Sequence, residues 1–170
     1  MKPRSLLLHR IALLLLVTTS AALGQERTLS TEQLTTGSDG VVVGKVAGMK
    51  SAWTADRSRI VTTVSISVDE QLKGTASGST LSVVVPGGEV DGVGEWYSHS
   101  ARFRRDEEVV VFARKDREGT LRVAGGSQGK VSVTRDTGKG QPRVDGQGTL
   151  QEFTATVRKA AQVQQAPDSN

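Results

Sequence analysis

The clearest pattern in this chain is a strict alternation of apolar and polar side chains between Ile60 and Val68. Ile60, Thr62, Val64, Ile66 and Val68 fall on one face, and the residues between them fall on the other. A period of two is typical of a strand with one face in a core and one face in water. A shift of one residue would turn serine and threonine inward, so the register is well specified. We therefore predict one long strand from about Arg59 to Leu72.

Shorter apolar segments on both sides of this strand predict further strands. They cover residues 41–46, 81–85, 109–113, 121–123 and 131–133, and most are separated by segments rich in glycine, serine or charge. The first begins with Val41-Val42-Val43, which is apolar on both faces, so we expect it in the middle of the sheet. The segments 47–58 and 89–107 are predicted as loops. Short strands with turns between them favour a small antiparallel β-barrel.

Two helices are expected at the ends of this array. Leu29–Leu34 reads as a short helix with Ser30 or Thr31 as its N-cap. A second helix is predicted over residues 149–163, capped by Thr149, with an apolar stripe at Leu150, Phe153, Val157 and Ala160.

The first 24 residues have the composition of a secretory signal peptide. Lys2 and Arg4 precede an apolar run that ends near Val17, and Ala22-Leu23-Gly24 fits the small residues of a cleavage site. The run is shorter than the ~20 residues of a spanning helix. We therefore expect an exported protein, periplasmic or extracellular, with no membrane span after cleavage. Beyond this signal peptide (1–24), we predict a barrel domain (25–135), a polar linker (136–148), the helix (149–163) and a disordered tail (164–170).

The charge of the exported part argues against nucleic acid as a partner. Without Lys2, Arg4 and Arg10, the 22 basic residues fall to 19 against 18 acidic ones, a net charge of +1. Binding to nucleic acid requires a strongly basic surface. The chain also contains no cysteine, so it has neither disulfides nor thiol chemistry.

Candidate catalytic chemistry is sparse. His99 is the single histidine after the signal peptide, and its neighbours Ser98 and Ser100 are too close in sequence for triad geometry. One histidine without cysteine is a poor zinc site, and Glu89, Asp91 and Glu95 match no complete calcium loop. We predict no enzymatic activity, no cofactor and no metal; a carboxylate- or metal-dependent enzyme is the less favoured alternative.

The predicted loops carry aromatic residues that are candidates for partner binding. Trp53, Trp96, Tyr97, His99 and Arg102 form this candidate set. Aromatic and arginine side chains on loops are frequent anchors for protein partners. The aromatic rings could equally plug one end of the barrel, and the sequence leaves both interpretations open.

One series of motifs resembles a known family. Ser38 to Val46, the long strand, Leu72-Lys73-Gly74, Leu81 to Val85 and Glu108 to Ala113 follow one another as in the OB-fold domain of the tissue inhibitors of metalloproteinases, and as in bacterial exported domains of similar type. The resemblance covers about Thr31 to Val133. It implies a mainly β fold, a small antiparallel OB-type β-barrel with a short N-terminal helix and a C-terminal amphipathic helix.

The resemblance also suggests a function. It implies an exported, non-enzymatic binding module, protein-binding or protease-inhibitor-like, with a partner such as a secreted metalloprotease. The amino-terminal cysteine that chelates zinc in those inhibitors has no counterpart here, because the expected terminus is Gln25. The alternative function is a passive structural domain of the cell envelope.

Overall fold

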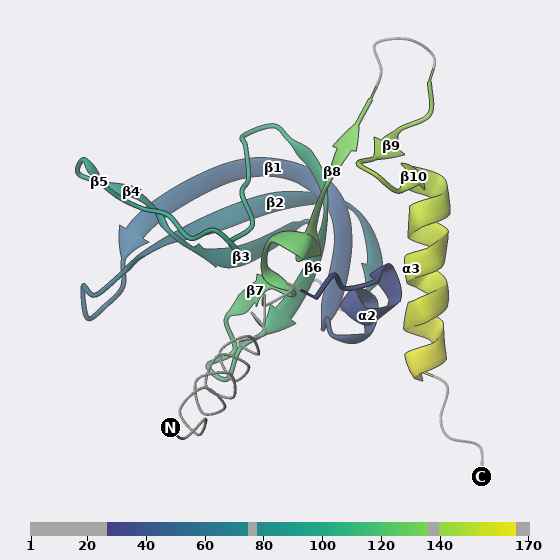
Figure 1. The fold of residues 1–170 in the computed structure, drawn as a ribbon, viewed down its shortest axis with the longest axis horizontal. Helices are drawn as coiled ribbons and strands as arrows, with labels where there is room; N and C mark the ends of the chain where they lie inside the picture. The colour runs from purple at the N-terminus through teal and green to yellow at the C-terminus, as the bar shows by residue number, and fades with distance from the viewer. Residues whose placement is uncertain (1–26, 75–77, 136–139, 166–170) are drawn as a thin grey trace, which may run out of the picture.

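The computed structural model describes residues 27–74, 78–135 and 140–165, and the predicted signal peptide lies outside these ranges (Figure 1). Five strands form the barrel: β1 (Gly40–Trp53), β2 (Ile60–Lys73), β3 (Thr80–Pro86), β6 (Glu108–Lys115) and β7 (Leu121–Val123). They follow the order β1-β2-β3-β7-β6, and β6 pairs with β1 to close the ring. The predicted mainly β fold with a small barrel is thus confirmed, with one correction to the expected antiparallel pairing. The β3–β7 pair is parallel, so the barrel is mixed.

The long alternating strand forms as predicted. β2 pairs with β1 on one edge and with β3 on the other. Ile60, Val64 and Ile66 are fully buried, and Thr62 and Val68 on the same face are half-buried. The alternating pattern therefore reports the real inward face of the strand.

The first half of β1 and the middle of β6 are buried on both faces. The first core lies inside the barrel and includes Val42, Val64 and Val111. The second lies between the barrel wall and the helices and includes Val41, Phe112 and other apolar side chains. A strand that separates two cores needs apolar residues at consecutive positions, which explains the uninterrupted valine runs in both strands.

Both helices begin with a capping box. In α2 (Thr31–Thr36), the backbone N–H of Gln33 donates to Ser30 Oγ at 3.2 Å, and the N–H of Ser30 donates to Gln33 Oε1 at 3.0 Å. In α3 (Leu150–Gln165), Thr149 and Glu152 make the equivalent reciprocal pair. These bonds satisfy backbone donors that have no partner inside the helix, and they confirm Ser30 and Thr149 as N-caps.

Helix α3 packs against the second core. Phe153 and Val157 are buried, and the Phe153 ring meets Phe112 edge-on with centroids 6.3 Å apart. The next buried position is Ala161, whereas the predicted Ala160 is only half-buried. Figure 1 shows this helix standing beside the barrel.

The turn at Lys73-Gly74 joins the barrel to α2. Lys73 Nζ donates to the backbone carbonyls of Thr35 and Ser38, both at 2.6 Å, at the C-terminal end of α2. Gly74 has φ +73°, and a Cβ there would lie 2.0 Å from the carbonyl oxygen of Asp39. The turn thus requires glycine, and the lysine ties β2 to the chain that leaves the C-terminal end of α2.

Two predicted loops contain strands. The predicted loop 47–58 is wrong up to Trp53, because β1 continues that far and pairs with β2 throughout. The predicted loop 89–107 contains most of a small hairpin, β4 (Gly88–Val90) and β5 (Val93–Glu95). Asp91 and Gly92 make its turn, both with positive φ, which is the geometry that Asp-Gly favours.

A 3₁₀ turn (Gly126–Gly129) leads into β8 (Lys130–Thr134), which pairs with β6 and corresponds to the strand predicted at residues 131–133. The described part of the segment predicted as a polar linker, residues 140–148, contains strand residues that the prediction did not include. Further on, β9 (Arg143–Val144) pairs with both β8 and β10 (Gly148–Thr149). Val144 is 2% exposed and belongs to the second core. Residues 164 and 165, expected in the tail, complete α3.

No helix in the described ranges has the length and apolar character needed to cross a membrane.

Candidate functional site

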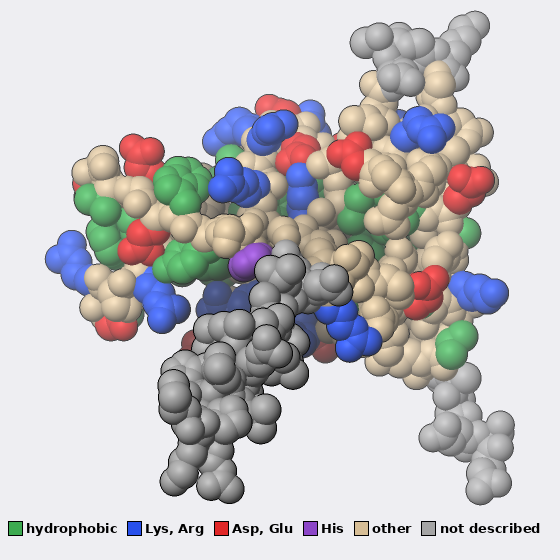
Figure 2. Space-filling view, in the orientation of Figure 1, with side chains coloured by type: hydrophobic (Ala, Val, Ile, Leu, Met, Phe, Trp, Pro, Cys, Tyr) green, Lys and Arg blue, Asp and Glu red, His purple; other side chains and the backbone are tan. Residues whose placement is uncertain are grey.

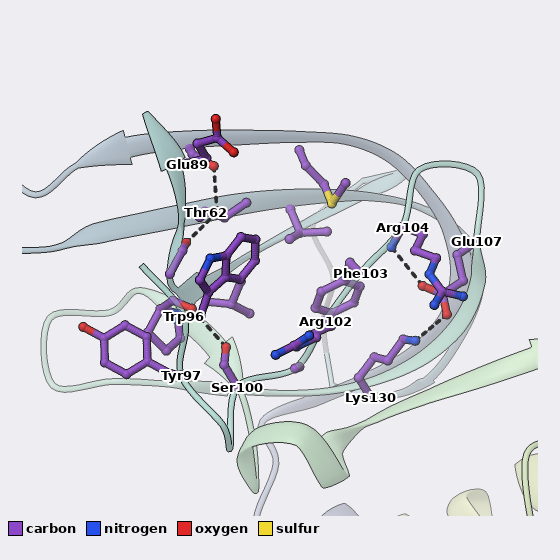
Figure 3. Close-up of a pocket in the computed structure, with 18 of the residues that line it drawn as sticks. Thr62, Glu89, Trp96, Tyr97, Ser100, Arg102, Phe103, Arg104, Glu107 and Lys130 are labelled. Atoms are coloured by element: carbon purple, nitrogen blue, oxygen red, sulfur yellow. Dashed lines mark hydrogen bonds and ion pairs between the residues drawn. The ribbon is translucent and has the colours of Figure 1, made fainter. Parts of the chain in front are cut away.

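An open groove of about 680 Å³ lies on the inner face of β1, β2 and β3, where these strands extend past the barrel (Figure 3). We call it the aromatic groove. Met49, Ser51, Thr62, Val64 and Val85 line it from the strands. The chain from Pro86 to Glu89 and the chain from Trp96 to Arg104 form its sides, and Glu107, Lys130, Ser132 and Asp145 complete the lining.

A glycine turn lets the chain leave β3 close to the sheet. Gly87 and Gly88 have φ of +93° and +138°. A Cβ on Gly88 would lie 2.4 Å from Thr62 Oγ1 and 2.5 Å from Ser51 Oγ. Thr62 Oγ1 donates to the Gly87 carbonyl at 2.7 Å, so the 2.9 Å contact between the two hydroxyls takes its proton from Ser51. Only glycine fits over this hydroxyl pair.

Glu95 anchors the returning strand of the β4–β5 hairpin. Its Oε2 accepts the backbone N–H of Ile60 at 2.9 Å, at the start of β2, and lies 3.3 Å from the Tyr97 hydroxyl. The Gly87 N–H donates to the Ile60 carbonyl at 2.9 Å. The N–H and the C=O of Ile60 are thus both hydrogen-bonded, and the segment that carries Trp96 and Tyr97 is fixed against the sheet.

Large apolar side chains at the rim of the groove are exposed. Trp96 is 70% exposed, Tyr97 39% and Met49 40%. The Arg102 guanidinium lies over the Trp96 ring, with its carbon 5.9 Å from the centroid, within the range of a cation–π contact. Figure 2 shows apolar side chains gathered around the β4–β5 end of the molecule. The sequence left open whether the Trp96 ring plugs one end of the barrel or lies free for a partner. Its exposure shows that it does not plug the barrel.

At the other end of the groove, Glu107 forms a partly buried ion pair with Lys130. Ser132 Oγ donates to the same Glu107 oxygen at 2.7 Å, and the Arg104 N–H donates to the other at 3.0 Å. Burial by itself would raise the pKa of Glu107, but the hydrogen bonds from Lys130, Ser132 and the Arg104 backbone together lower that pKa below its ordinary value. Glu107 is therefore a carboxylate at neutral pH, and it orders this end of the groove.

The predicted site residues separate into two groups. Trp96, Tyr97 and Arg102 line the aromatic groove. His99 lines an adjacent hollow of about 410 Å³, which it shares with Tyr97, and its backbone carbonyl accepts the Ser127 N–H at 2.9 Å. Trp53 lines neither of these; it ends β1, half-buried and opposite Ile60. Four of the five candidate residues thus line two adjacent hollows, and Trp53 lies outside both.

Several groove residues were missed by the sequence analysis. Met49 lies in a segment predicted as a loop, Thr62 lies on a strand that reads as ordinary sheet, and Lys130 comes from a segment 28 positions after Arg102. The β4–β5 hairpin itself had a usable signal, since Asp91-Gly92 between two valines predicts a tight turn. Nothing local to the sequence indicates that Glu95 bonds to Ile60.

Groups of three or more His, Asp or Glu side chains suited to hold a metal ion do not occur within residues 27–74, 78–135 and 140–165. Glu95, considered above as a possible calcium ligand, instead accepts the Ile60 N–H.

No protein-family model, curated protein or solved structure matches this chain.

Proposed function

We propose that this chain is an exported, non-enzymatic binding module that holds another exported protein in the aromatic groove. The observation that carries the proposal is Trp96, an indole that is 70% exposed, lies within cation–π range of Arg102 and follows Glu95, which is anchored to Ile60. An exposed cluster of large apolar groups on a small domain generally marks an interaction surface.

The composition of the rim supports a protein partner. Tryptophan, tyrosine, arginine and methionine are enriched where proteins bind each other, and the first three dominate binding free energies. Here Trp96, Tyr97, Arg102 and Met49 surround one groove. The backbone that carries Trp96 is held at Ile60, so less conformational entropy is lost when a partner binds.

The resemblance to the tissue inhibitors of metalloproteinases suggests a secreted metalloprotease as one such partner. Because the zinc-chelating cysteine has no counterpart, inhibition by this chain would work through the groove and would need no cofactor. Export rests on the signal-peptide pattern of residues 1–24. A passive structural domain of the envelope is the competing function, and it has no use for an ordered, exposed tryptophan.

The test compares the wild-type chain with Trp96→Ala. Both proteins are immobilised and exposed to the exported protein fraction of the source cells, and bound proteins are identified by mass spectrometry. We expect the wild type to retain a specific protein that the variant loses. A secreted zinc protease such as thermolysin is assayed in parallel for inhibition by both proteins.

The control is the stability of the variant. Because the Trp96 ring is mostly in water, Trp96→Ala should unfold at the same denaturant concentration as the wild type, within about 0.5 kcal/mol. Equal retention by the two folded proteins, or no specific retention by the wild type, would contradict the proposal.

A further inference from the structure

From Gly48 to Trp53, one backbone edge of β1 has no hydrogen-bonded strand partner among the described residues. Over Gly40–Lys45 this edge pairs with β6, and Val46 bonds to Glu107 and Asp106. Within the described part of the chain, β1 from Gly48 onward pairs with β2 alone, on the opposite edge, and β4 lies near β1 without forming a ladder with it. Figure 1 shows β1 as the outermost strand of this extended ribbon. An exposed edge is a ready template for another strand.

The ladder defines which backbone groups point outward. The Thr54 N–H donates to the Arg59 carbonyl at 2.8 Å, so Thr54 faces β2. Hydrogen-bonded and non-bonded pairs alternate along an antiparallel ladder. Lys50 and Ala52 therefore face β2 as well, and the N–H and C=O groups of Met49, Ser51 and Trp53 face the open edge. The side chains of Met49 and Ser51 line the aromatic groove, so the edge and the groove are adjacent.

The charge around this edge indicates the chemistry of the strand that would pair with it. Lys50, Arg104 and Arg105 are exposed, and none forms an ion pair within the described part of the chain. Arg105 Nη1 lies 3.5 Å from the Ala47 carbonyl, at one end of the open edge. Glu89 and Asp145 are the exposed carboxylates among the described residues of the groove lining, and Glu89 lies on β4 toward the other end of the open edge. An acidic residue opposite Lys50 would gain a favourable cross-strand pair.

The same charges disfavour a second copy of this chain as the occupant. Two copies could pair their β1 edges antiparallel, related by a two-fold axis near Lys50. Each Lys50 would then lie opposite, or diagonal to, the other Lys50. Like charges at those positions destabilise a sheet. A lysine in mid-edge, together with the bulge between Val46 and Gly48, is a recognised protection against self-association.

We propose that the partner binds by adding an extended segment of about five residues to the open edge of β1, with an acidic side chain opposite Lys50 and apolar side chains over Met49. This inference rests on the proposed function, because it describes how the same surface holds its partner. Backbone bonds to Met49, Ser51 and Trp53 would supply affinity, and the groove would select the alternate side chains.

The experiment uses protein expressed from the full-length chain and a displayed library of random dodecapeptides as the probe. Selected peptides are synthesised and titrated into the protein while amide hydrogen exchange is followed by NMR. We expect an acidic residue between apolar ones, and at least tenfold slower exchange at the amides of Met49, Ser51 and Trp53. The amides of Lys50 and Ala52, already bonded to β2, should change little.

A charge-reversal pair supplies the matched control. Lys50→Glu should raise the peptide Kd at least tenfold, whereas Lys159→Glu, an equal charge change on the exposed face of α3, should leave the Kd unchanged. N-methylation of every second peptide amide removes the donors along one edge of the peptide. It should abolish binding when the methylated edge faces β1, and methylation of the other amides should leave binding intact. The inference is overturned if the library yields no binder, or if binders leave the three amides exchanging freely.

The two proposals can fail separately. If the protein retained in the pull-down depends on Trp96 but does not protect the amides of Met49, Ser51 and Trp53, the groove function stands and strand addition is wrong. If the amides are protected and Trp96→Ala binds as well as the wild type, strand addition stands and the groove function is wrong.

Discussion

Gly88 illustrates how much of the aromatic groove depends on a single residue. Its φ of +138° lies in a region that residues with a side chain avoid, and its missing side chain makes room for the hydroxyls of Ser51 and Thr62. The turn directs the chain into the β4–β5 hairpin, whose second strand ends at Glu95. The position of Trp96 thus follows from a glycine eight residues earlier.

The first prediction concerns this glycine. Gly88→Ala should lower the free energy of unfolding by about 1–3 kcal/mol, because it forces both a strained backbone and a steric overlap. Chemical denaturation measures the change. Gly48→Ala is the control: a Cβ there meets nothing within 4 Å, and no positive φ is involved, so the change should stay within about 0.5 kcal/mol. Equal effects of the two variants would contradict this account of the turn.

The second prediction concerns Glu107. Glu107→Gln removes the carboxylate that Lys130 and Ser132 bind, so stability at neutral pH should fall by about 1–3 kcal/mol. The folded-state pKa of Glu107 is lowered below its ordinary value of 4.5. Its contribution is therefore complete above pH 4.5 and is lost as the pH falls through the lowered pKa.

Stability measured against pH for both proteins checks this. The gap between wild type and Glu107→Gln should be widest near neutral pH and should narrow in acid. Other carboxylates with lowered pKa values, such as Glu32 and Asp116, titrate in both proteins, so the difference between the two curves isolates Glu107. A gap that does not depend on pH would show that the ion pair is not the source of the stability.

At the scale of the elements, α3 packs on the second core through Phe153. The Phe153 ring is 4% exposed and packs edge-on against Phe112 of β6. Phe153→Ala should reduce the free energy of unfolding by about 3–5 kcal/mol, measured by denaturant titration. Val163, 72% exposed on the same helix, serves as control, and Val163→Ala should change stability by less than about 0.5 kcal/mol. A small effect of Phe153→Ala would mean that α3 is not essential to the second core.

The elements that the sequence predicted are those whose pattern is local. Strand β2 alternates for nine residues, and the apolar runs of β1 and β6 reflect burial on both faces. The second half of β1 was missed because Ala47 to Trp53 has no alternation; it forms a strand through its register with β2. Val144 was assigned to a linker because one valine among polar residues gives no pattern, yet long-range packing buries it.

The same distinction applies to the candidate site. Trp96, Tyr97 and Arg102, chosen from the sequence as binding candidates in one segment between strands, line the same groove. Trp53 was grouped with them because the segment around it reads as a loop, although it ends a strand. Met49, Thr62 and Lys130 could not be predicted, since only closure of the barrel brings three separate strands to one groove.

For the whole molecule, export predicts a defined amino terminus. If the signal peptide is removed after Gly24, the protein isolated from outside the cytoplasm should begin at Gln25, or at its cyclised form. The intact mass and the amino-terminal peptide, both measured by mass spectrometry, test this. Protein that retains residues 1–24 would rule out the proposed cleavage.

The central claim is that the aromatic groove binds a protein, and calorimetric titration of the retained partner against two matched variants tests it most directly. Trp96→Ala and Val163→Ala each remove an exposed apolar side chain, but only the first lies at the groove. We predict that Trp96→Ala raises the Kd about tenfold or more and that Val163→Ala leaves it unchanged. Equal Kd values for both variants and the wild type would contradict the claim.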